Sequence, residues 1–330
     1  MLPIADAALA QLLAERLGAV EERLRGVVTY ADRLADTASR HLVNAGGKRL
    51  RPLLTLLAAQ LGDGSRPEVV DAAVVCELTH LATLYHDDVM DSAPLRRGAP
   101  AAHEVWDNSV AILTGDLLFA RASMTVAGLG PEAVRIQAAT FERLCLGQLH
   151  ETVGPEDGED PVEHYLQVLA DKTGSLVATS GRFGAMFGGC APEVVRLMTD
   201  FGEKVGVAFQ LADDVIDLSA DPAATGKTPG TDLREKVPTM PVLLLRARVK
   251  GAGPSAADRE LLELLDSDLS SDEALGEAVA ALRAHAVVDE TRTLAETWAR
   301  EAAQTLAPLP QGTVKDALEH FAATLVHRSA

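Results

Sequence analysis

The sequence is poor in aromatic residues, in cysteine and in positive charge. Aromatic residues make up only 4% of the 330-residue chain while Ala, Leu, Glu and Arg abound, a balance that favours helices over sheets. Basic residues number 30 against 48 acidic ones, and the net charge of −18 argues against a nucleic-acid partner. The cysteines show no metal or redox spacing, so buried, reduced thiols in a cytoplasmic protein are expected for Cys76, Cys145 and Cys190.

Long apolar runs are also missing. No run approaches the length of a membrane span, so we expect no transmembrane segment. The N-terminal stretch carries acidic residues where a signal peptide would carry basic ones, and it predicts amphipathic helices over 7–17 and 20–28, joined near Gly18. Hydrophobic residues still make up 47% of the chain, enough for a sizeable core. No shift in composition marks a boundary, so residues 1–330 are expected to form one all-α domain.

The chain does contain two acidic triplets, each behind an apolar helical run. The first triplet consists of Asp87, Asp88 and Asp91. The second, with the same spacing, consists of Asp213, Asp214 and Asp217. Residues four apart share a helix face, and carboxylates that emerge from a packed wall are normally paired or bound to a cation. A single triplet is often just a solvated surface, but two copies favour a metal site.

Positive charge is concentrated near the first triplet. The stretch AGGKRLRP, residues 45–52, places two glycines at a helix end and a proline in the first turn of the next helix. Its cations are Lys48, Arg49 and Arg51. Together with the amides of a helix N-terminus they predict an anion site, although an ordinary basic turn is the alternative. Arg96 and Arg97 follow the triplet and suit bidentate contacts with phosphate.

Three further features point toward the same cavity. His80 falls on one helical stripe with Glu77, Leu84 and Asp87, so it is a candidate to face the acids. Lys172-Thr173-Gly174 interrupts a long apolar run; a kink that turns a cation and a hydroxyl into a cavity and a plain exposed lysine are equally compatible with it. The loop over 221–241 is rich in Gly, Pro and Asp and could cover a bound anion with Lys227, Arg234 and Lys236.

These residue types together indicate a reaction class. Hard oxygen ligands without thiolate or imidazole select magnesium, or manganese, and magnesium commonly bridges carboxylates and a diphosphate. Such ions neutralise a departing diphosphate, and arginine and lysine stabilise the same charge. An otherwise apolar cavity suits a hydrocarbon diphosphate that ionises to a carbocation. A second anion site at Lys48 and Arg51 implies a second diphosphate substrate.

The chain resembles the trans-prenyltransferases of the polyprenyl diphosphate synthase family. The resemblance covers nearly the whole chain, through GGKRLRP, HLATLYHDDVMD, RR, KTG, FQLADDVID and the GK…GTDLRE loop, in order. It implies a single-domain helix bundle of the isoprenoid synthase type with a central cavity. It also implies a homodimer that uses magnesium to condense an allylic diphosphate head-to-tail with isopentenyl diphosphate in isoprenoid biosynthesis.

The resemblance also implies a role for each matching position. The metal ligands would be Asp87 and Asp91, with Asp88 nearby, and Asp213, with Asp214 and Asp217. The allylic diphosphate would contact Arg96, Lys172 and Lys227. Isopentenyl diphosphate would be held by Lys48, Arg51, His80 and Arg97. Thr173 and Gln210 would lie near the carbocation. Lys236 replaces a glycine of the family loop, so its equivalence to the family's substrate-binding lysine stays open.

Product length should depend on the helix before the first triplet. Ala82 and Thr83 are small and the triplet has no insertion, so we expect a medium or long product, from about six isoprene units upward. Tyr85 could narrow the channel, in which case a short geranylgeranyl or farnesyl product is the alternative. Candidates for a deeper floor are Phe119, Phe141 and Leu144.

Other classes fit the sequence less well. A class I terpene cyclase would have an Asn/Ser/Glu second motif and would not need a second anion site. A head-to-head synthase should lack the Gly-Gly-Lys anion site. A non-catalytic partner subunit would typically have lost the aspartates, and a purely structural helical protein would have no reason to carry both triplets.

Overall fold

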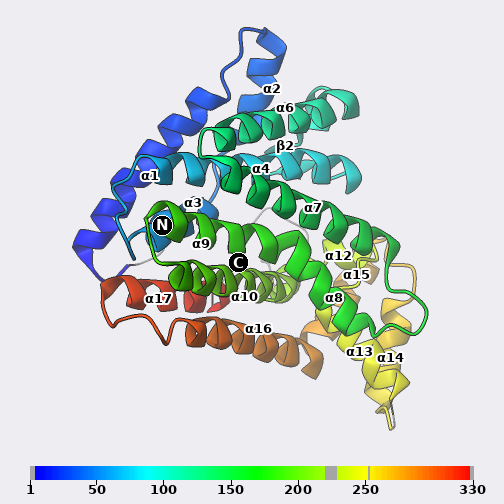
Figure 1. Cartoon of the computed structure of the whole chain (residues 1–330). Helices are drawn as coiled ribbons and strands as arrows, with labels where there is room; N and C mark the ends of the chain where they lie inside the picture. The colour runs from blue at the N-terminus through cyan, green and yellow to red at the C-terminus, as the bar shows by residue number, and fades with distance from the viewer. Residues whose placement is uncertain (1–3, 220–228, 252, 328–330) are drawn as a thin grey trace.

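The computed structural model describes residues 4–219, 229–251 and 253–327, and these are almost entirely helical (Figure 1). The prediction of an all-α bundle is confirmed. The first half contains α1 (Ala7–Val27), α2 (Arg33–Asn44), α3 (Leu50–Ala59), α4 (Glu68–Met90), α5 (Ala102–Val105), α6 (Asn108–Ala127) and α7 (Pro131–Val153). The second half contains α8 (Pro161–Leu169), the π-helical turn η1 (Ala170–Gly174), α9 (Ser175–Phe187), α10 (Pro192–Ser219), α12 (Thr231–Arg234), α13 (Met240–Lys250), α14 (Ala256–Leu265), α15 (Asp272–Arg283), α16 (Ala286–Thr305) and α17 (Thr313–His327).

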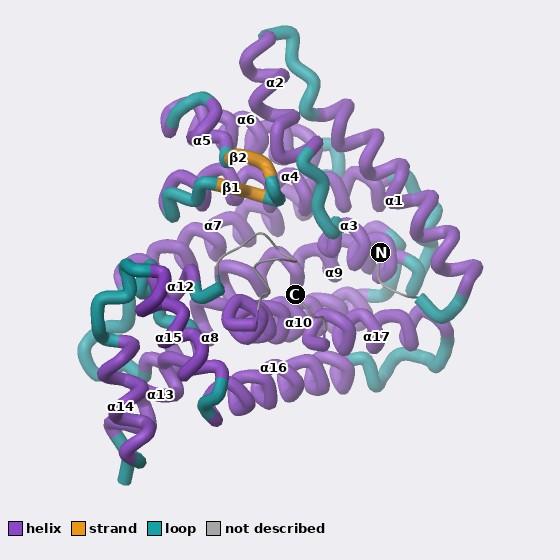
Figure 2. Tube along the Cα trace, turned by 180° about the vertical axis from the view of Figure 1, so that it is seen from behind, coloured by secondary structure: helices purple, strands orange, loops and turns teal. Residues whose placement is uncertain are grey.

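Long helices packed side by side form the body of the molecule. Helix α4 packs against α3, α6 and α9, while α10 packs against α9, α16 and α17. Both views show α12 to α15 gathered at one end of this bundle (Figures 1 and 2). The strands β1 (Leu95–Arg96) and β2 (Ala99–Pro100) form a two-stranded hairpin directly after α4. The hairpin brings Arg96 back to Asp88 near the end of α4, and Arg97 to the Leu42 carbonyl near the end of α2.

The first helix differs from the sequence expectation. Residues 7–27 form one continuous helix rather than two helices joined near Gly18. The side chain of Asp6 caps its start by accepting a hydrogen bond from the Leu9 amide at 2.8 Å. Glycine costs only about 1 kcal/mol inside a helix, and burial of Leu13, Val20 and Leu24 on one face outweighs it.

Two glycines let neighbouring helices approach the π-helical turn. A Cβ on Gly206 of α10 would lie 2.6 Å from Gly174 Cα, and one on Gly147 of α7 would lie 2.7 Å from the Lys172 amide nitrogen. Backbone atoms cannot move aside as a flexible side chain can. The interruption predicted near Lys172-Thr173-Gly174 is therefore a π-helical turn held between α7 and α10.

Composition alone missed the length of one apolar helix and the exposure of two cysteines. Of the described helices, only α6 is long and apolar enough to span a membrane by length and hydropathy, with 33% of its apolar window buried. It packs along α4 and contributes Leu118 and Val126 to the main core. Of the three cysteines, all of which are free, only Cys76 is fully buried. Cys190 is half-buried and Cys145 is exposed, because it lies on the outer face of α7.

Candidate active site

A cavity of about 530 Å³ brings the predicted site residues together. Asp87, near the end of α4, and Asp213, on α10, both line it, so the two acidic triplets meet in space. The stripe of Glu77, His80 and Leu84 lines it too, as expected for one helix face. The other predicted site residues in its wall are Lys48, Arg51, Thr83, Arg96, Arg97, Leu144, Lys172, Thr173 and Gln210.

Carboxylates crowd one end of the cavity. Burial raises the pKa of Asp87 to about 6, an effect that Lys172 opposes and that Asp91 reinforces. Burial likewise raises the pKa of Asp232 to about 6, with Asp217, Asp213 and Asp91 contributing as neighbouring negative charges. Asp232 thus lies within the field of both triplets. A bound divalent cation would favour the charged form of every one of these groups.

The middle aspartate of each triplet is turned toward protein groups. Asp88 is fully buried and accepts a 2.5 Å hydrogen bond from Arg96 Nε. Asp214 is buried, and its carboxylate accepts hydrogen bonds from the Tyr165 hydroxyl at 2.9 Å and the Met240 amide at 3.0 Å. Burial raises the pKa of Asp214 to about 8. Neither residue is part of the cavity wall that contains Asp87 and Asp213.

The π-helical turn presents polar groups to the cavity. Lys172 forms an ion pair with Glu151 near the end of α7, and Thr173 Oγ1 donates to Gln210 Oε1 at 3.3 Å. Beneath them, Arg143 donates to the buried Asp171 at 2.6 Å. Lys172 therefore faces the cavity rather than open solvent. Glu151 had not been predicted, because a lone acid after an apolar helix carries no distinctive signal in the sequence.

Cations gather at the opposite end. Arg97 donates through Nη1 to the carbonyls of Leu42, at 3.2 Å, and Gly46. Its guanidinium lies over Gly47, where a Cβ would approach Arg97 Cζ to 2.8 Å, so a side chain there would displace it. Burial, reinforced by the surrounding arginines, lowers the pKa of His80 well below its ordinary value. This end can bind an anion through guanidinium, ammonium and neutral imidazole groups.

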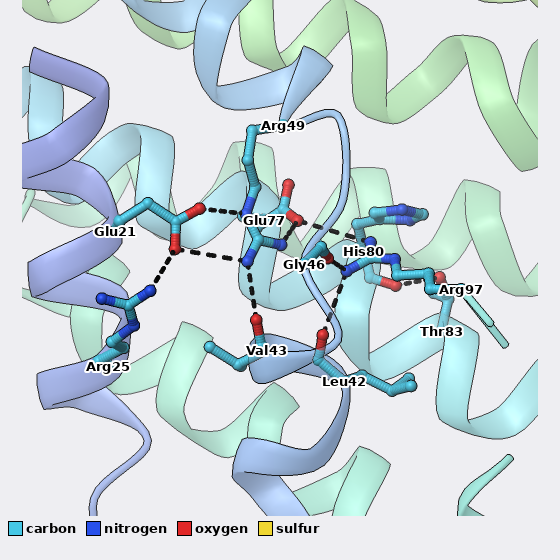
Figure 3. A network of polar contacts seen from close by, with 10 residues as sticks. All are labelled: Glu21, Arg25, Leu42, Val43, Gly46, Arg49, Glu77, His80, Thr83 and Arg97. Carbon is cyan, nitrogen blue, oxygen red and sulfur yellow. Dashed lines mark hydrogen bonds and ion pairs between the residues drawn. The ribbon is translucent and has the colours of Figure 1, made fainter. Parts of the chain in front are cut away.

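Arg49 behaves differently from the free anion ligand that the sequence suggested. Its guanidinium is held between Glu21 of α1 and Glu77 of α4, and it also donates to the Val43 carbonyl (Figure 3). Arg51, two residues on, has a buried Nε without a hydrogen-bond partner among the described residues. Of these two arginines, Arg51 is therefore the one with hydrogen-bonding capacity left for a ligand.

Two predicted lysines are not seen in the wall of the main cavity, for different reasons. Lys227 falls outside the described residues. Lys236 is exposed and borders a separate hollow with Arg246 and Asp266, so the structure does not bring it to the main cavity. Its φ of 59° lies in the left-handed region, which glycine adopts at little cost. This explains why the family that the chain resembles has glycine at this position.

The three residues proposed to control product length have different surroundings. Only Thr83 lines the cavity. Ala82 is buried beside α6, where a Cβ on Gly115 would lie 3.0 Å from the Ala82 carbonyl oxygen. The Tyr85 hydroxyl donates to the Ala38 carbonyl at 2.5 Å and accepts from the Leu42 amide at 3.2 Å. Tyr85 is thereby fixed to α2.

The donor groups at the acidic end suit a hard divalent cation. Within the part of the chain that is described, no three carboxylate, imidazole or thiol groups stand close enough to hold a metal alone. Magnesium is commonly held by one or two carboxylates together with substrate phosphates, and the oxygens of Asp87 and Asp213 are of the kind it prefers. A cavity that combines carboxylates with guanidiniums is suited to binding a diphosphate, through metal ions or directly.

Comparison with known proteins identifies the family. The polyprenyl synthetase family model matches residues 32–282. Nonaprenyl diphosphate synthase from Mycobacterium tuberculosis is 44% identical over 308 residues, which cover 93% of this chain and 90% of that protein. The chain belongs to the polyprenyl synthetase family, as its motifs predicted, and is a prenyltransferase.

Solved structures agree with this assignment. Geranylgeranyl pyrophosphate synthase from Corynebacterium glutamicum, complexed with calcium and isoprenyl diphosphate, is 41% identical with a TM-score of 0.85, and 98% of each chain is covered. A polyprenyl synthase from Caulobacter crescentus, complexed with the same ligands, is 31% identical with a TM-score of 0.89, covering 98% of this chain and 97% of that one.

The position of Lys236 makes a first prediction. Replacing Lys236 by glycine should raise the free energy of unfolding by about 0.5–1 kcal/mol, because a left-handed backbone no longer carries a Cβ. Catalytic activity should stay unchanged. Urea unfolding and a condensation assay measure the two effects. Lys236→Ala is the matched control, since it removes the charge and keeps the strain. If both variants lose activity, Lys236 binds substrate after all.

Proposed function

We propose that this chain is a trans-prenyltransferase that condenses an allylic diphosphate head-to-tail with isopentenyl diphosphate to make a medium- or long-chain polyprenyl diphosphate. The observation that carries this proposal is the shared cavity, with Asp87 and Asp213 at one end and Arg51, Arg97 and His80 at the other. Two oppositely charged ends can hold one diphosphate through metal ions and a second one directly.

Each end then has its own substrate. The allylic diphosphate would lie at the acidic end, where magnesium supplies neutralisation of the leaving group when bound to Asp87, Asp91 and Asp213. Arg96 and Lys172 would contact the same diphosphate, as would Lys227, and they stabilise the charge that develops on it. Isopentenyl diphosphate would be held by Lys48, Arg51, His80 and Arg97. Manganese offers a similar coordination and is a second possible ion.

The reaction needs no protein nucleophile. The allylic carbon–oxygen bond breaks and the diphosphate leaves with the electron pair. The oxygens of Thr173 and Gln210, which lie 3.3 Å apart in the cavity wall, would face the cation. The isopentenyl double bond attacks it to form the new carbon–carbon bond, and the released diphosphate accepts the proton that is lost.

The side chains that line the cavity are the basis for the proposed length of the product. Thr83 is a small side chain at the point where a growing tail would pass below Asp87. Tyr85, which could have narrowed the path, points to α2 instead. Leu144 lines the cavity, and the adjoining pair Phe119 and Phe141, with ring centroids 3.8 Å apart, is a candidate for a deeper floor. The likeness to a nonaprenyl diphosphate synthase supports a long product, whereas that to a geranylgeranyl pyrophosphate synthase keeps a short one as the alternative.

A second copy of the chain is the proposed partner. Helices α6 and α7 pack against each other and expose apolar side chains. Leu113 and Met124 lie three turns apart on α6, and Leu146, Leu149 and Val153 form a stripe on α7. Exposed apolar stripes on adjoining helices are typical of protein–protein interfaces, which supports the homodimer expected for this family. We also propose a cytoplasmic location, in keeping with the free cysteines.

The reaction itself is the main prediction. With magnesium, farnesyl and isopentenyl diphosphates should give linear all-trans products, and chelation of the metal should abolish them. Asp87→Asn and Asp213→Asn should each lower kcat at least about 10²-fold, because an electrostatic partner of the leaving group is lost. Asp200→Asn, at an exposed position of the same helix as Asp213, is the control. A cyclic hydrocarbon formed from the allylic diphosphate alone would contradict the proposal.

Product length is the next prediction. Thr83→Phe should shorten the product by several isoprene units, because the ring would occupy the path below Asp87. Mass analysis of the dephosphorylated products measures this. Thr83→Val, which keeps the size of the side chain, should leave the distribution as it is. An unchanged distribution with phenylalanine would mean that the tail takes another path.

The homodimer is tested by its exposed apolar side chains. Leu113→Glu should shift sedimentation from dimer toward monomer, since a charge would be buried at the interface. Leu12→Glu on α1, another exposed leucine, should leave the dimer intact. A wild-type chain that sediments as a monomer at micromolar concentration would refute the assignment.

A further inference from the structure

The cation end of the cavity contains a carboxylate, which is unexpected at a site for an anion. Glu77 is only 2% exposed and lines the cavity wall. Its Oε1 lies 2.6 Å from Arg49 Nη1 and 3.8 Å from Arg97 Nη2 (Figure 3). Taken alone, its negative charge would repel a diphosphate at this end. Its presence therefore calls for a role that concerns the arginines rather than the ligand.

The guanidinium of Arg49 donates hydrogen bonds to protein groups. Nε donates to Glu21 at 2.5 Å, Nη1 donates to Glu77, and Nη2 donates to the Val43 carbonyl at 3.1 Å. Its side chain is 4% exposed. A guanidinium held between two carboxylates is a strong, directional contact. It joins α1, the end of α2 and α4 through a single side chain.

The backbone of Arg49 is held in an unfavourable conformation. Its φ of 48° and ψ of 39° are left-handed, at the residue that immediately precedes α3. A non-glycine residue stays there only when its surroundings fix it. Lys48 precedes it directly and Arg51 follows two residues later, and all three border the cavity. The direction in which these two cations leave the backbone therefore depends on Arg49.

We propose that Glu21, Arg49 and Glu77 form a positioning triad for the second diphosphate site. Arg49 binds no substrate; it fixes the backbone that aims Lys48 and Arg51, and Glu77 also steadies Arg97. The identity of the ligand, isopentenyl diphosphate, rests on the function proposed above.

Kinetics with the two substrates separates this role from general stability. Arg49→Lys keeps the charge, but one ammonium cannot span both carboxylates. It should raise the KM for isopentenyl diphosphate about tenfold or more, because small displacements of binding groups are costly, while the KM for the allylic diphosphate changes little. Equal increases in both KM values, or no increase, would refute the triad.

The Glu21→Gln variant distinguishes positioning from direct binding, because the two roles predict opposite changes in the KM for isopentenyl diphosphate. If Arg49 were a substrate ligand, releasing it from Glu21 would strengthen binding; in the triad, the same change weakens it. Glu21 is 26% exposed, so this variant should fold even if Arg49→Lys does not. The control is Arg25→Gln, which removes a 59% exposed arginine 3.8 Å from the same carboxylate and should shift neither KM.

Two further measurements complete the test. The double variant Glu21→Gln/Arg49→Lys should be no worse than Arg49→Lys alone, because Glu21 acts only through Arg49; additive losses would refute this. Calorimetric titration with inorganic diphosphate, in the presence of a chelator, measures binding without catalysis. The affinities of the wild type and the variants should follow the same order as their KM values for isopentenyl diphosphate. If the wild type bound diphosphate but made no prenyl product, the proposed function would fail while this titration still decided the triad.

Discussion

Every charge in the cavity wall has to be balanced inside a largely apolar bundle, and this constraint governs the site. Carboxylates and guanidiniums are costly to bury unless each faces an opposite charge. The described residues satisfy this in pairs: Lys172 with Glu151, Arg96 with Asp88, and Arg49 with both Glu21 and Glu77. The pairs hold long side chains in place, so a ligand meets groups that are already oriented.

The same constraint explains why the acidic end needs a cation. Burial raises the pKa values of Asp87 and Asp232 to about 6, so ionising these groups costs more in the metal-free protein than in water. Divalent ions stabilise the charged forms, and a diphosphate brings the remaining oxygen ligands. Binding of metal and allylic substrate should therefore depend on each other. The cation end has no such need, because its own arginines supply the charge.

Much of this arrangement could be predicted from the sequence. The stripe through His80 and Asp87 follows from helix periodicity, and Lys172-Thr173-Gly174 shows as a break in an apolar run. His80, Asp87, Lys172 and Thr173 do converge on the cavity. What could not be predicted depends on distant partners. In the sequence, Arg49 and Arg51 are both cations of the predicted anion site. In the structure, Glu21 and Glu77 hold Arg49.

Other misses have local causes. The left-handed backbone at Lys236 could not be predicted, because a lysine, unlike a glycine, does not indicate that conformation. A glycine in a helix, such as Gly18, looks like a break in the sequence although packing can override it. The exposure of Cys145 depends on which face of α7 is covered, and an apolar run does not specify that.

The two triplets show how one spacing serves two purposes. Neighbouring helical residues are turned about 100° from each other, whereas residues four apart nearly coincide. In both triplets the first aspartate lines the cavity, whereas the second is buried outside the cavity wall. Asp88 accepts a hydrogen bond from Arg96, and Asp214 accepts hydrogen bonds from Tyr165 and from the first residue of α13. These two buried aspartates therefore fix the surroundings of the two aspartates that face the cavity. Changing Asp88 or Asp214 would disturb the geometry of the site even if neither residue touches a metal ion.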